Sequence, residues 1–319
     1  MLSKPTRVAE APPRQAGEAS SRLQRPAWRF EAGAEIAPGR AALKPLGGGS
    51  LYEVYLVWDE PLHAICVAKV VRPDQVSDEH ALSDLRAEAE ILERLAHPVI
   101  VRGFDAVLEG PHPHLLLEHL EGPSLRRLIK RGGALPLQQL LPLALSLSGA
   151  LHYLARIGVV HLDVKPDNII VGVPPRLIDL SIARSAESAR RIRRPVGTDA
   201  YMAPEQCRPE SGGRLIGPPS DVWGLGATLH HALSGSKPFP RQRGARESDD
   251  PRLRFPQLAV RPEPLPDHLP AVLRSLVSSM LDPDPLARPA AGEVAARLEP
   301  LVAELPRKMA LSRRGARVW

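Results

Sequence analysis

The sequence predicts an α+β fold in which a small β-rich half precedes a larger, mostly helical half. Residues 31–71 consist of short apolar runs, rich in Val, Ile and Tyr, which glycine and proline interrupt. After residue 122 the apolar residues instead recur at the spacing of helices. A chain of 319 residues can form two compact units, or one unit with two lobes, and can bury a sizeable core.

The individual elements follow in order along the chain. Strands are expected within residues 31–71 and again over 114–117, and a helix over 77–96 lies between them. The pattern changes near residues 118–122, where the two halves join. The helical half is expected to contain helices over residues 124–130, 137–157, 221–233, 270–281 and 292–301.

Both ends of the chain differ in composition from its body. Residues 1–29 are rich in Pro, Ala, Arg and Ser without an apolar period, which predicts a disordered, basic N-terminal tail. Residues 306–319 form a second basic tail. The predicted division is therefore a tail (1–29), a β-rich lobe (30–119), a helical lobe (120–305) and a tail (306–319).

The composition argues against several classes of protein. Two cysteines cannot form a disulfide framework or a four-cysteine zinc site, which favours a reducing compartment. No apolar run is long enough for a secretory signal or a membrane span, so we expect a cytoplasmic protein. Aromatic residues make up only 4%, which argues against a specific nucleic-acid partner despite the net charge of +6.

A glycine-rich segment and a lysine mark the β-rich half. Residues 46–55 read LGGGSLYEVY, and glycines between two strands let backbone amides approach a phosphate; a flexible hairpin turn is the alternative. Lys69 follows Gly49 by 20 residues, in an apolar strand-like run of a chain with only seven lysines. We expect Lys69 to face an anionic ligand, although a place at a strand edge is the alternative.

Glu88 is the expected partner of this lysine. On a helical wheel it falls within the apolar stripe that contains Leu85 and Leu92. A carboxylate on a buried helix face needs a cation, because burying it unpaired is costly, and Lys69 is the natural candidate. The alternative is a half-exposed helix glutamate.

The segment that starts at residue 161 carries the densest set of polar groups. Residues 161–168 read HLDVKPDN, and two short strands around a turn precede the next aspartate. The groups are two carboxylates, an ammonium and an amide oxygen, from Asp163, Asp179, Lys165 and Asn168. Hard oxygen ligands of this kind suit Mg²⁺, which is usually shared with the phosphates of a substrate.

Taken in order, these motifs resemble those of the protein kinase family over about residues 36–303. Residues 115–122 resemble the family's hinge, residues 197–205 the end of its activation segment, and residues 221–226 its buried large-lobe helix. Arg288 stands where relatives pair an arginine with the position of Glu205. The order and spacing of the motifs carry the resemblance, and the compact Arg- and Pro-rich chain looks like a bacterial eukaryotic-like serine/threonine kinase.

The resemblance implies a bilobal kinase fold that binds ATP and Mg²⁺ between its lobes. Adenine would bond the backbone at residues 118 and 120, with Leu117 as gatekeeper. The implied nucleotide contacts are Leu46, Gly47, Gly48, Gly49, Val54, Ala68, Lys69, Leu117, Glu118 and Leu120.

The resemblance also implies a role for each catalytic residue. Lys69, oriented by Glu88, would hold the α- and β-phosphates. Asp163 would orient a Ser or Thr hydroxyl of a protein substrate and accept its proton, while Lys165 steadies the transferring group. The implied metal ligands are Asn168 and Asp179.

Four positions depart from the family pattern. Tyr52 replaces the third glycine of the loop, and we expect it to stiffen the loop tip and to lower ATP affinity or turnover. Leu162 replaces an arginine that reads a phosphate, so we hypothesise that activity does not require activation-loop phosphorylation. Ser181 stands where glycine is usual, after Leu180 in place of phenylalanine, and we expect it to restrict flips of this segment.

Several functional alternatives stay open. The chain could be a pseudokinase that serves as a scaffold, or a small-molecule phosphotransferase that shares the lobe architecture. The activation loop carries Arg190, Arg191, Arg193 and Arg194, which form either a solvated, mobile stretch or a docking patch for an acidic partner.

Overall fold

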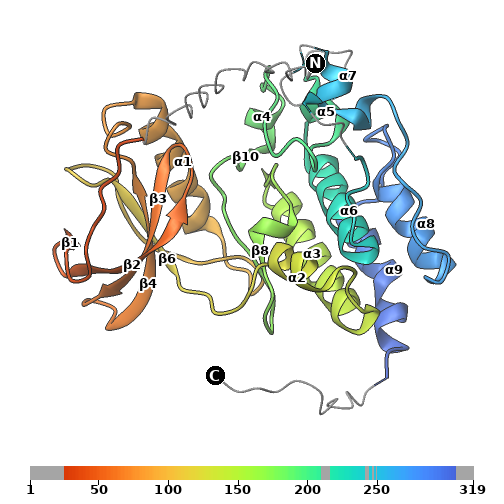
Figure 1. Cartoon of the computed structure of the whole chain (residues 1–319), viewed down its shortest axis with the longest axis horizontal. Helices are drawn as coiled ribbons and strands as arrows, with labels where there is room; N and C mark the ends of the chain where they lie inside the picture. Colours follow the sequence, from red (N-terminus) through yellow and green to blue (C-terminus); the bar gives the residue numbers. More distant parts are fainter. Residues whose placement is uncertain (1–24, 210–215, 241–243, 246–247, 249, 307–319) are drawn as a thin grey trace, which may run out of the picture.

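The computed structural model describes residues 25–209, 216–240, 244–245, 248 and 250–306. It has the bilobal α+β architecture that the sequence predicts, with the β-rich N-lobe on one side and the helical C-lobe on the other (Figure 1). Most of both expected tails, residues 1–24 and 307–319, lies outside the described residues.

The N-lobe is built on a six-stranded antiparallel sheet in the order β1-β2-β3-β4-β6-β5. One helix, α1 (Glu79–Arg94), packs against β5 and β6 and begins at Asp78, whose side chain accepts a hydrogen bond from the backbone N–H of His80. The strands are β1 (Glu35–Ala37), β2 (Arg40–Gly48), β3 (Tyr52–Asp59), β4 (Ala64–Val71), β5 (Gly103–Val107) and β6 (His114–Glu118).

The two faces of this sheet bury different partners. One face joins the main core, which includes residues of α1 and continues into the C-lobe. The other face buries Tyr55, Cys66 and Ala68 under Trp28 and Phe30. The Trp28 indole donates to the carbonyl oxygen of Val71 at 2.7 Å, so the ordered lobe begins before residue 30, within the segment expected to be tail.

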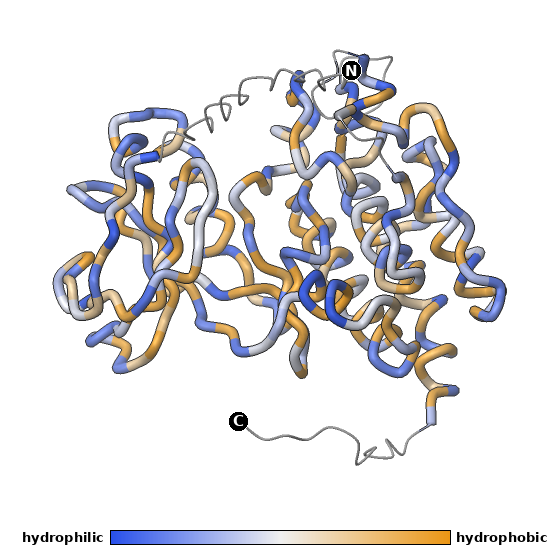
Figure 2. The backbone as a smooth tube through the Cα atoms, viewed as in Figure 1, coloured by the Kyte–Doolittle hydropathy of each residue, from blue (hydrophilic) through white to orange (hydrophobic). Residues whose placement is uncertain are grey.

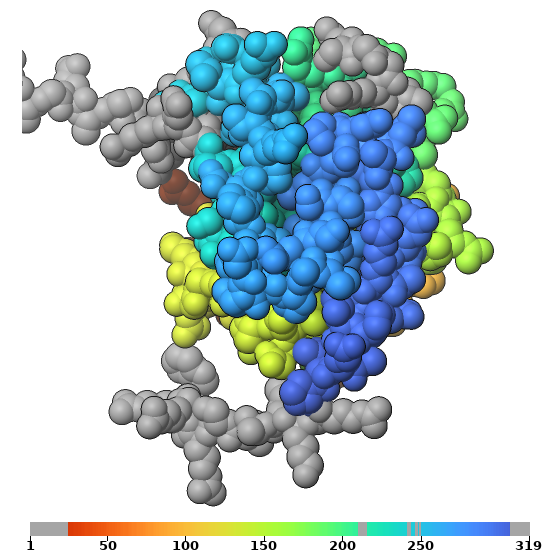
Figure 3. Space-filling model, turned by 90° about the vertical axis from the view of Figure 1, so that its right-hand side faces the viewer, coloured from red at the N-terminus to blue at the C-terminus, as the bar shows by residue number. Residues whose placement is uncertain are grey.

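The C-lobe consists of helices around α6 (Pro218–Ser234), which is buried along almost its whole length. Helix α3 (Leu137–Arg156) packs against both α6 and α9 (Ala291–Ala303). Hydrophobic and hydrophilic positions are interleaved along these helices (Figure 2). On the outer face of the lobe, α8 (Ala271–Met280) and α9 lie side by side (Figure 3).

Short elements complete the C-lobe. A two-stranded sheet pairs β7 (Val159–Val160) with β10 (Arg184–Ser185), and a second pairs β8 (Ile169–Ile170) with β9 (Arg176–Leu177). The remaining helices are α2 (Leu125–Gly132), α4 (Ala186–Ala189), α5 (Pro204–Cys207), α7 (Pro251–Arg254) and the 3₁₀ turns η1 (Pro166–Asn168) and η3 (Pro256–Leu258). Among the described residues, none of the helices combines the length and the apolar character needed to cross a membrane.

The expected helices and strands are present, with ends that differ by a few residues. The strand β5 was not predicted, because its residues are mostly exposed at the edge of the sheet and show no buried alternation.

Candidate active site

A cavity of about 950 Å³ lies between the lobes, lined by the glycine-rich segment, α1, β6 and the start of the activation segment. Most of the residues expected to contact a nucleotide or metal line it, whereas Gly47 and Ala68 do not. Those that do are Leu46, Gly48, Gly49, Val54, Lys69, Leu117, Glu118, Leu120, Asn168 and Asp179.

The expectation for Ala68 is wrong by one residue. Side chains alternate across a strand, and Lys69 on β4 faces the cavity. Ala68 therefore points to the opposite face and packs in the cluster with Tyr55, while Val67 lines the cavity. The alternation from Lys69 would have identified Val67 from the sequence. Sequence reasoning also missed further apolar residues that line the cavity, which are Leu51, Val101, Ile170, Ile178 and Ile182.

A buried ion pair joins the sheet to α1 inside this cavity. The Lys69 Nζ atom donates to both carboxylate oxygens of Glu88, at 2.6 and 2.9 Å. It also lies 3.3 Å from Oδ1 of Asp179. Burial alone would lower the pKa of Lys69, but the two carboxylates outweigh it and raise that pKa, so the side chain is an ammonium.

Tyr52 lies against this pair rather than at the tip of the glycine-rich segment. Its ring centroid is 4.6 Å from the Lys69 Nζ atom, and its hydroxyl donates to the carbonyl oxygen of Ala81 at 3.3 Å. Burial raises the pKa of Tyr52 to about 12. The expected stiffening of the loop tip thus does not arise from this side chain, which instead ties β3 to α1. At Gly48, with φ +159°, an added Cβ would lie 2.6 Å from the Tyr52 carbonyl oxygen.

The loop of residues 161–168 brings the acceptor-side groups together. Asp163 Oδ2 accepts from Lys165 Nζ at 2.6 Å and from Asn168 Nδ2 at 3.2 Å. Its other oxygen, Oδ1, accepts from the backbone N–H of Thr198 at 3.0 Å. Lys165 also donates to the Thr198 hydroxyl at 2.7 Å. The loop and the end of the activation segment are therefore locked around one carboxylate.

A buried carboxylate beneath the loop fixes its backbone. Asp221 accepts from the backbone N–H groups of His161 and Leu162, both at 2.7 Å. Leu162 has φ +69°, a conformation that costs a branched residue free energy and needs such support. Burial raises the pKa of Asp221 to about 6, although His161 and the two N–H bonds oppose the shift.

Leu162 also anchors the activation segment. It belongs to a buried apolar cluster with Val160, Ala189 and Ile216, and residues Ile182, Ala186, Ile192 and Val196 pack against this cluster. At position 162 the family pattern has an arginine that binds a phosphate on the activation segment. In this chain Leu162 makes apolar contacts with that segment.

Asp179 and Asn168 offer oxygen ligands on one side of the cavity. Burial raises the pKa of Asp179, but Lys69 and the hydrogen bond from Ser181 outweigh burial and lower that pKa to about 2, so the group is ionised. The Ser181 hydroxyl donates to Asp179 Oδ1 at 2.7 Å, which gives the departure from glycine a contact of its own. Within the described ranges no cluster of three His, Cys, Asp or Glu forms a metal cage. Two protein oxygens, completed by water and phosphate, are the usual set for Mg²⁺, and the donors here fit it.

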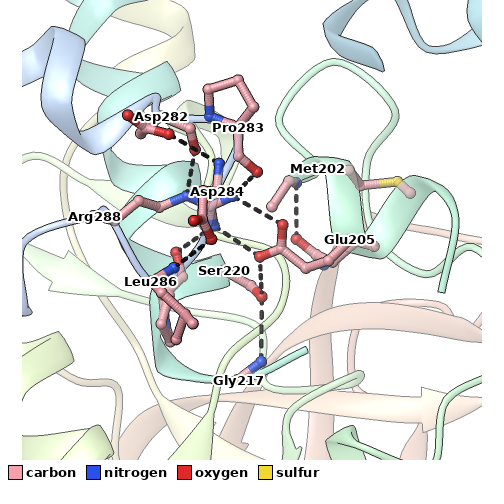
Figure 4. Close-up of polar contacts among 12 residues, drawn as sticks. Met202, Glu205, Gly217, Ser220, Asp282, Pro283, Asp284, Leu286 and Arg288 are labelled. Carbon is pink, nitrogen blue, oxygen red and sulfur yellow. Dashed lines mark hydrogen bonds and ion pairs between the residues drawn. The ribbon is translucent and has the colours of Figure 1, made fainter. Parts of the chain in front are cut away.

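A second buried ion pair lies in the C-lobe, away from this cavity. The Arg288 guanidinium donates to both carboxylate oxygens of Glu205 at 2.7 and 2.9 Å, and both side chains are fully buried. Arg288 also donates to the carbonyl oxygens of Asp282 and Pro219, while Ser220 donates to Glu205 (Figure 4). The pair fastens α5, at the end of the activation segment, to α6 and to the loop before α9.

Comparison with known proteins agrees with this arrangement. The family described as protein kinase domain matches residues 41–297. Serine/threonine-protein kinase PknB of Mycobacterium leprae is 32% identical over 203 residues, which cover 61% of this chain and 32% of that protein. Probable serine/threonine-protein kinase PkwA of Thermomonospora curvata is 32% identical over 266 residues, 82% of this chain and 34% of that protein.

The extent of the match bears on what it shows. The chain spans about a third of the length of the curated relatives it matches. The family match, in contrast, covers both lobes and includes the cavity, the 161–168 loop and the Arg288–Glu205 pair. On this match, with the fold and the motifs in the expected order, the chain belongs to the protein kinase domain family.

Proposed function

We propose that this protein transfers the γ-phosphoryl group of ATP, with Mg²⁺, to Ser or Thr hydroxyls of protein substrates. The observation that carries the proposal is the complete set of site groups in one assembled arrangement. The ammonium of Lys69 is held by Glu88 beside ionised Asp179, and Asp163 lies where the activation segment meets the 161–168 loop. A cytoplasmic location belongs to the proposal, because Cys66 and Cys207 are buried free thiols.

Each residue has a task in this proposal. ATP with its bound Mg²⁺ supplies the phosphoryl group and screens its negative charge. Lys69 holds the phosphates, and Asn168 with Asp179 holds the metal. The Glu118 N–H already donates to Arg102, so the adenine would use the Glu118 carbonyl and the Leu120 N–H. In these roles the side chains supply position and charge stabilisation rather than covalent chemistry.

The acceptor side is served by the 161–168 loop. Asp163 orients the incoming hydroxyl through one carboxylate oxygen and takes its proton as the oxygen attacks phosphorus. Lys165 lies 2.6 Å from Asp163 and stabilises the negative charge of the group in transit.

Two alternatives are less well supported. A pseudokinase scaffold does not need the groups that carry out phosphoryl transfer. Here these groups are all present and lie around the cavity and the 161–168 loop: Lys69, Glu88, Asp163, Asn168 and Asp179. A small-molecule phosphotransferase has no need of a ledge for a peptide. Here the Arg288–Glu205 pair, with its full set of hydrogen bonds, fastens the segment that forms such a ledge in protein kinases.

The decisive experiment incubates the protein with labelled ATP, Mg²⁺ and a generic protein substrate, beside Asp163→Asn. Transfer to Ser or Thr by the parent, with a loss of about 100-fold or more in the variant, is expected because the general base is gone. Nucleotide binding without transfer would support the scaffold, and transfer only to small hydroxyl compounds would support the phosphotransferase.

We further propose that activity does not depend on activation-loop phosphorylation. The apolar cluster around Leu162 supports this, since it holds the segment without a phosphate. Turnover of the fully dephosphorylated protein should match that of the autophosphorylated form within about twofold. A large drop on dephosphorylation would refute this part of the proposal and leave phosphoryl transfer itself intact.

The exposed arginines of the activation segment remain a proposed docking patch for an acidic partner. Arg190, Arg191, Arg193 and Arg194 are all exposed, and Arg191 pairs with Glu187, which is exposed as well. Charge reversal at these four positions should weaken phosphorylation of an acidic cellular substrate and spare a generic one. Equal effects on both would favour the simple solvated stretch.

A further inference from the structure

A second cavity, of about 810 Å³, opens in the C-lobe beside the end of the activation segment. Its walls come from α2, from residues 199–200, from the end of α6 with the segment that follows, and from the end of α7. It contains none of the groups that the proposed phosphoryl transfer uses.

The charged residues that line this cavity are mostly cations. Arg126, Lys130, Lys237 and Arg254 all line it, against the single carboxylate of Asp199. Asp199 is itself neutralised in part, because it lies 3.5 Å from Arg254. Among the described lining residues the balance of charge is therefore strongly positive.

His231 lies in the wall of the cavity and adds no charge to it. Its ring nitrogen Nδ1 bonds the Tyr201 hydroxyl at 2.7 Å. Burial, together with the nearby cations Arg126 and Lys237, lowers the pKa of His231 to about 4, while Asp167 opposes the shift. The imidazole is thus neutral at pH 7, and the positive potential of the cavity comes from the permanent cations.

One wall of the cavity is adjacent in the chain to the residue that bonds Asp163 and Lys165. Asp199 in its wall directly follows Thr198, so their Cα atoms are about 3.8 Å apart. Thr198 in turn bonds both Asp163 and Lys165. A peptide that presents its hydroxyl to Asp163 would therefore pass the mouth of the cavity within a few residues of the acceptor.

We propose that this cavity is a subsite for an anionic side chain of the substrate, either an Asp or Glu carboxylate or a phosphorylated residue. The proposal rests on the proposed function and adds a substrate class to it: acceptor Ser or Thr residues within acidic or already phosphorylated segments. Arg126 and Lys130, four residues apart on α2, face the cavity together and present donors to the anion.

The test compares synthetic peptides that share one acceptor serine. One peptide has neutral flanks, a set carries a single Glu at each flanking position in turn, and a matching set carries phosphoserine. We expect at least one Glu or phosphoserine position to raise kcat/KM about tenfold over the neutral peptide. A hydrogen bond to a charged group in a partly enclosed site stabilises binding by an amount that corresponds to about this factor. The preference should shrink as salt is added.

Variants on α2 assign the preference to the cavity. The double variant Arg126→Gln/Lys130→Gln should bring the ratio of anionic to neutral peptide close to one. The matched control Arg127→Gln/Arg131→Gln removes the same charge from the same helix at positions that do not line the cavity, and it should keep the ratio. The ratio is used because it is insensitive to a general loss of active protein.

The outcomes separate this inference from the proposed function. If the parent phosphorylates neutral and anionic peptides equally, or if both α2 variants lose the preference alike, the subsite is refuted while the kinase activity stands. If no peptide is phosphorylated at all, the proposed function fails first. A preference for phosphoserine without one for Glu would narrow the substrate class to previously phosphorylated segments.

Discussion

The two buried ion pairs of this protein differ in how completely the protein itself surrounds them. Arg288 and Glu205 in the C-lobe are fully buried and meet further backbone and hydroxyl partners on every side. Lys69 and Glu88 in the N-lobe border a cavity, and the lysine also lies 3.3 Å from Asp179, whose side chain is 40% exposed.

The difference separates a structural role from a chemical one. A buried pair whose hydrogen bonds are all met inside the protein has nothing left to offer a ligand, and breaking it leaves a naked charge in the core. A pair that shares its ammonium with a second carboxylate at a cavity wall has positive charge available for phosphates. Either pair can be broken by substitution, and the largest effect is expected at the closed one.

Arg288→Met should destabilise the fold more than Lys69→Met or any change at the surface. It leaves the Glu205 carboxylate buried without a cation, which costs about 3–5 kcal/mol of unfolding free energy. Denaturant or thermal unfolding measures the loss. Arg274→Met is the matched control, since Arg274 pairs with Asp267, which is 98% exposed, and it should cost less than about 1 kcal/mol. Equal losses in the two variants would mean that enclosure of the pair is not what matters.

Lys69→Met should do the reverse and remove activity while keeping the fold. Loss of the ammonium removes a group that stabilises charge in the site, and phosphoryl transfer should fall by about 100-fold or more. The unfolding free energy should fall less than in Arg288→Met. Because Glu88 lines a cavity, its carboxylate can be hydrated or protonated once the ammonium is gone. The double variant Lys69→Met/Glu88→Gln should regain stability without activity.

Lys44→Met provides the control for that experiment. Lys44 is an exposed lysine on β2, which β3 separates from the Lys69 strand β4 in the same sheet, so its loss should leave both transfer and unfolding nearly unchanged. Should Lys69→Met unfold the protein as severely as Arg288→Met, the distinction between an open and a closed pair would not hold.

Much of this contrast could be predicted from the sequence, and the reason lies in its short-range patterns. The place of Glu88 on the buried face of α1 follows from helical periodicity, and its cation from the cost of an unpaired charge. The 161–168 loop concentrates its groups within eight residues, so the set of groups could be predicted locally, although Asp221 and Thr198 hold the loop from distant segments. The partnership of Arg288 with Glu205, 83 residues apart, came only from the resemblance to kinases.

What the sequence did not predict depends on contacts between distant segments. Tyr52 was expected at a loop tip, but its hydroxyl reaches Ala81 across 29 residues, a contact that no local pattern encodes. Trp28 lies in a segment of tail-like composition and is held by a hydrogen bond to Val71, at the end of the interior strand β4. Ala68 is a different case, since simple strand alternation already excluded it from the cavity.

Tyr52 gives a finer test of the open pair. Tyr52→Leu removes the ring that lies over the Lys69 ammonium and should lower kcat/KM for ATP about two- to thirtyfold, because a cation–π contact of this kind contributes about 0.5–2 kcal/mol. Tyr52→Phe keeps the ring and should lose less than twofold. If Tyr52→Phe lowers kcat/KM as much as Tyr52→Leu does, the contribution of Tyr52 comes from its hydroxyl bond to Ala81 on α1 and not from its ring.

Asp221 is a third buried carboxylate to compare with Glu205 and Glu88, and it is held by backbone N–H groups. Its pKa in the folded protein is about 6, above the ordinary 3.8, so the folded state binds more protons than the unfolded state between these values. The stability that Asp221 contributes is therefore fully present below pH 3.8 and is lost as the pH rises through about 6. The unfolding free energy of the parent, measured relative to Asp221→Asn, should fall by about 1 kcal/mol from pH 5 to pH 7. A difference that is flat or rises with pH would show that the two backbone N–H bonds stabilise the charge as fully as a guanidinium does for Glu205.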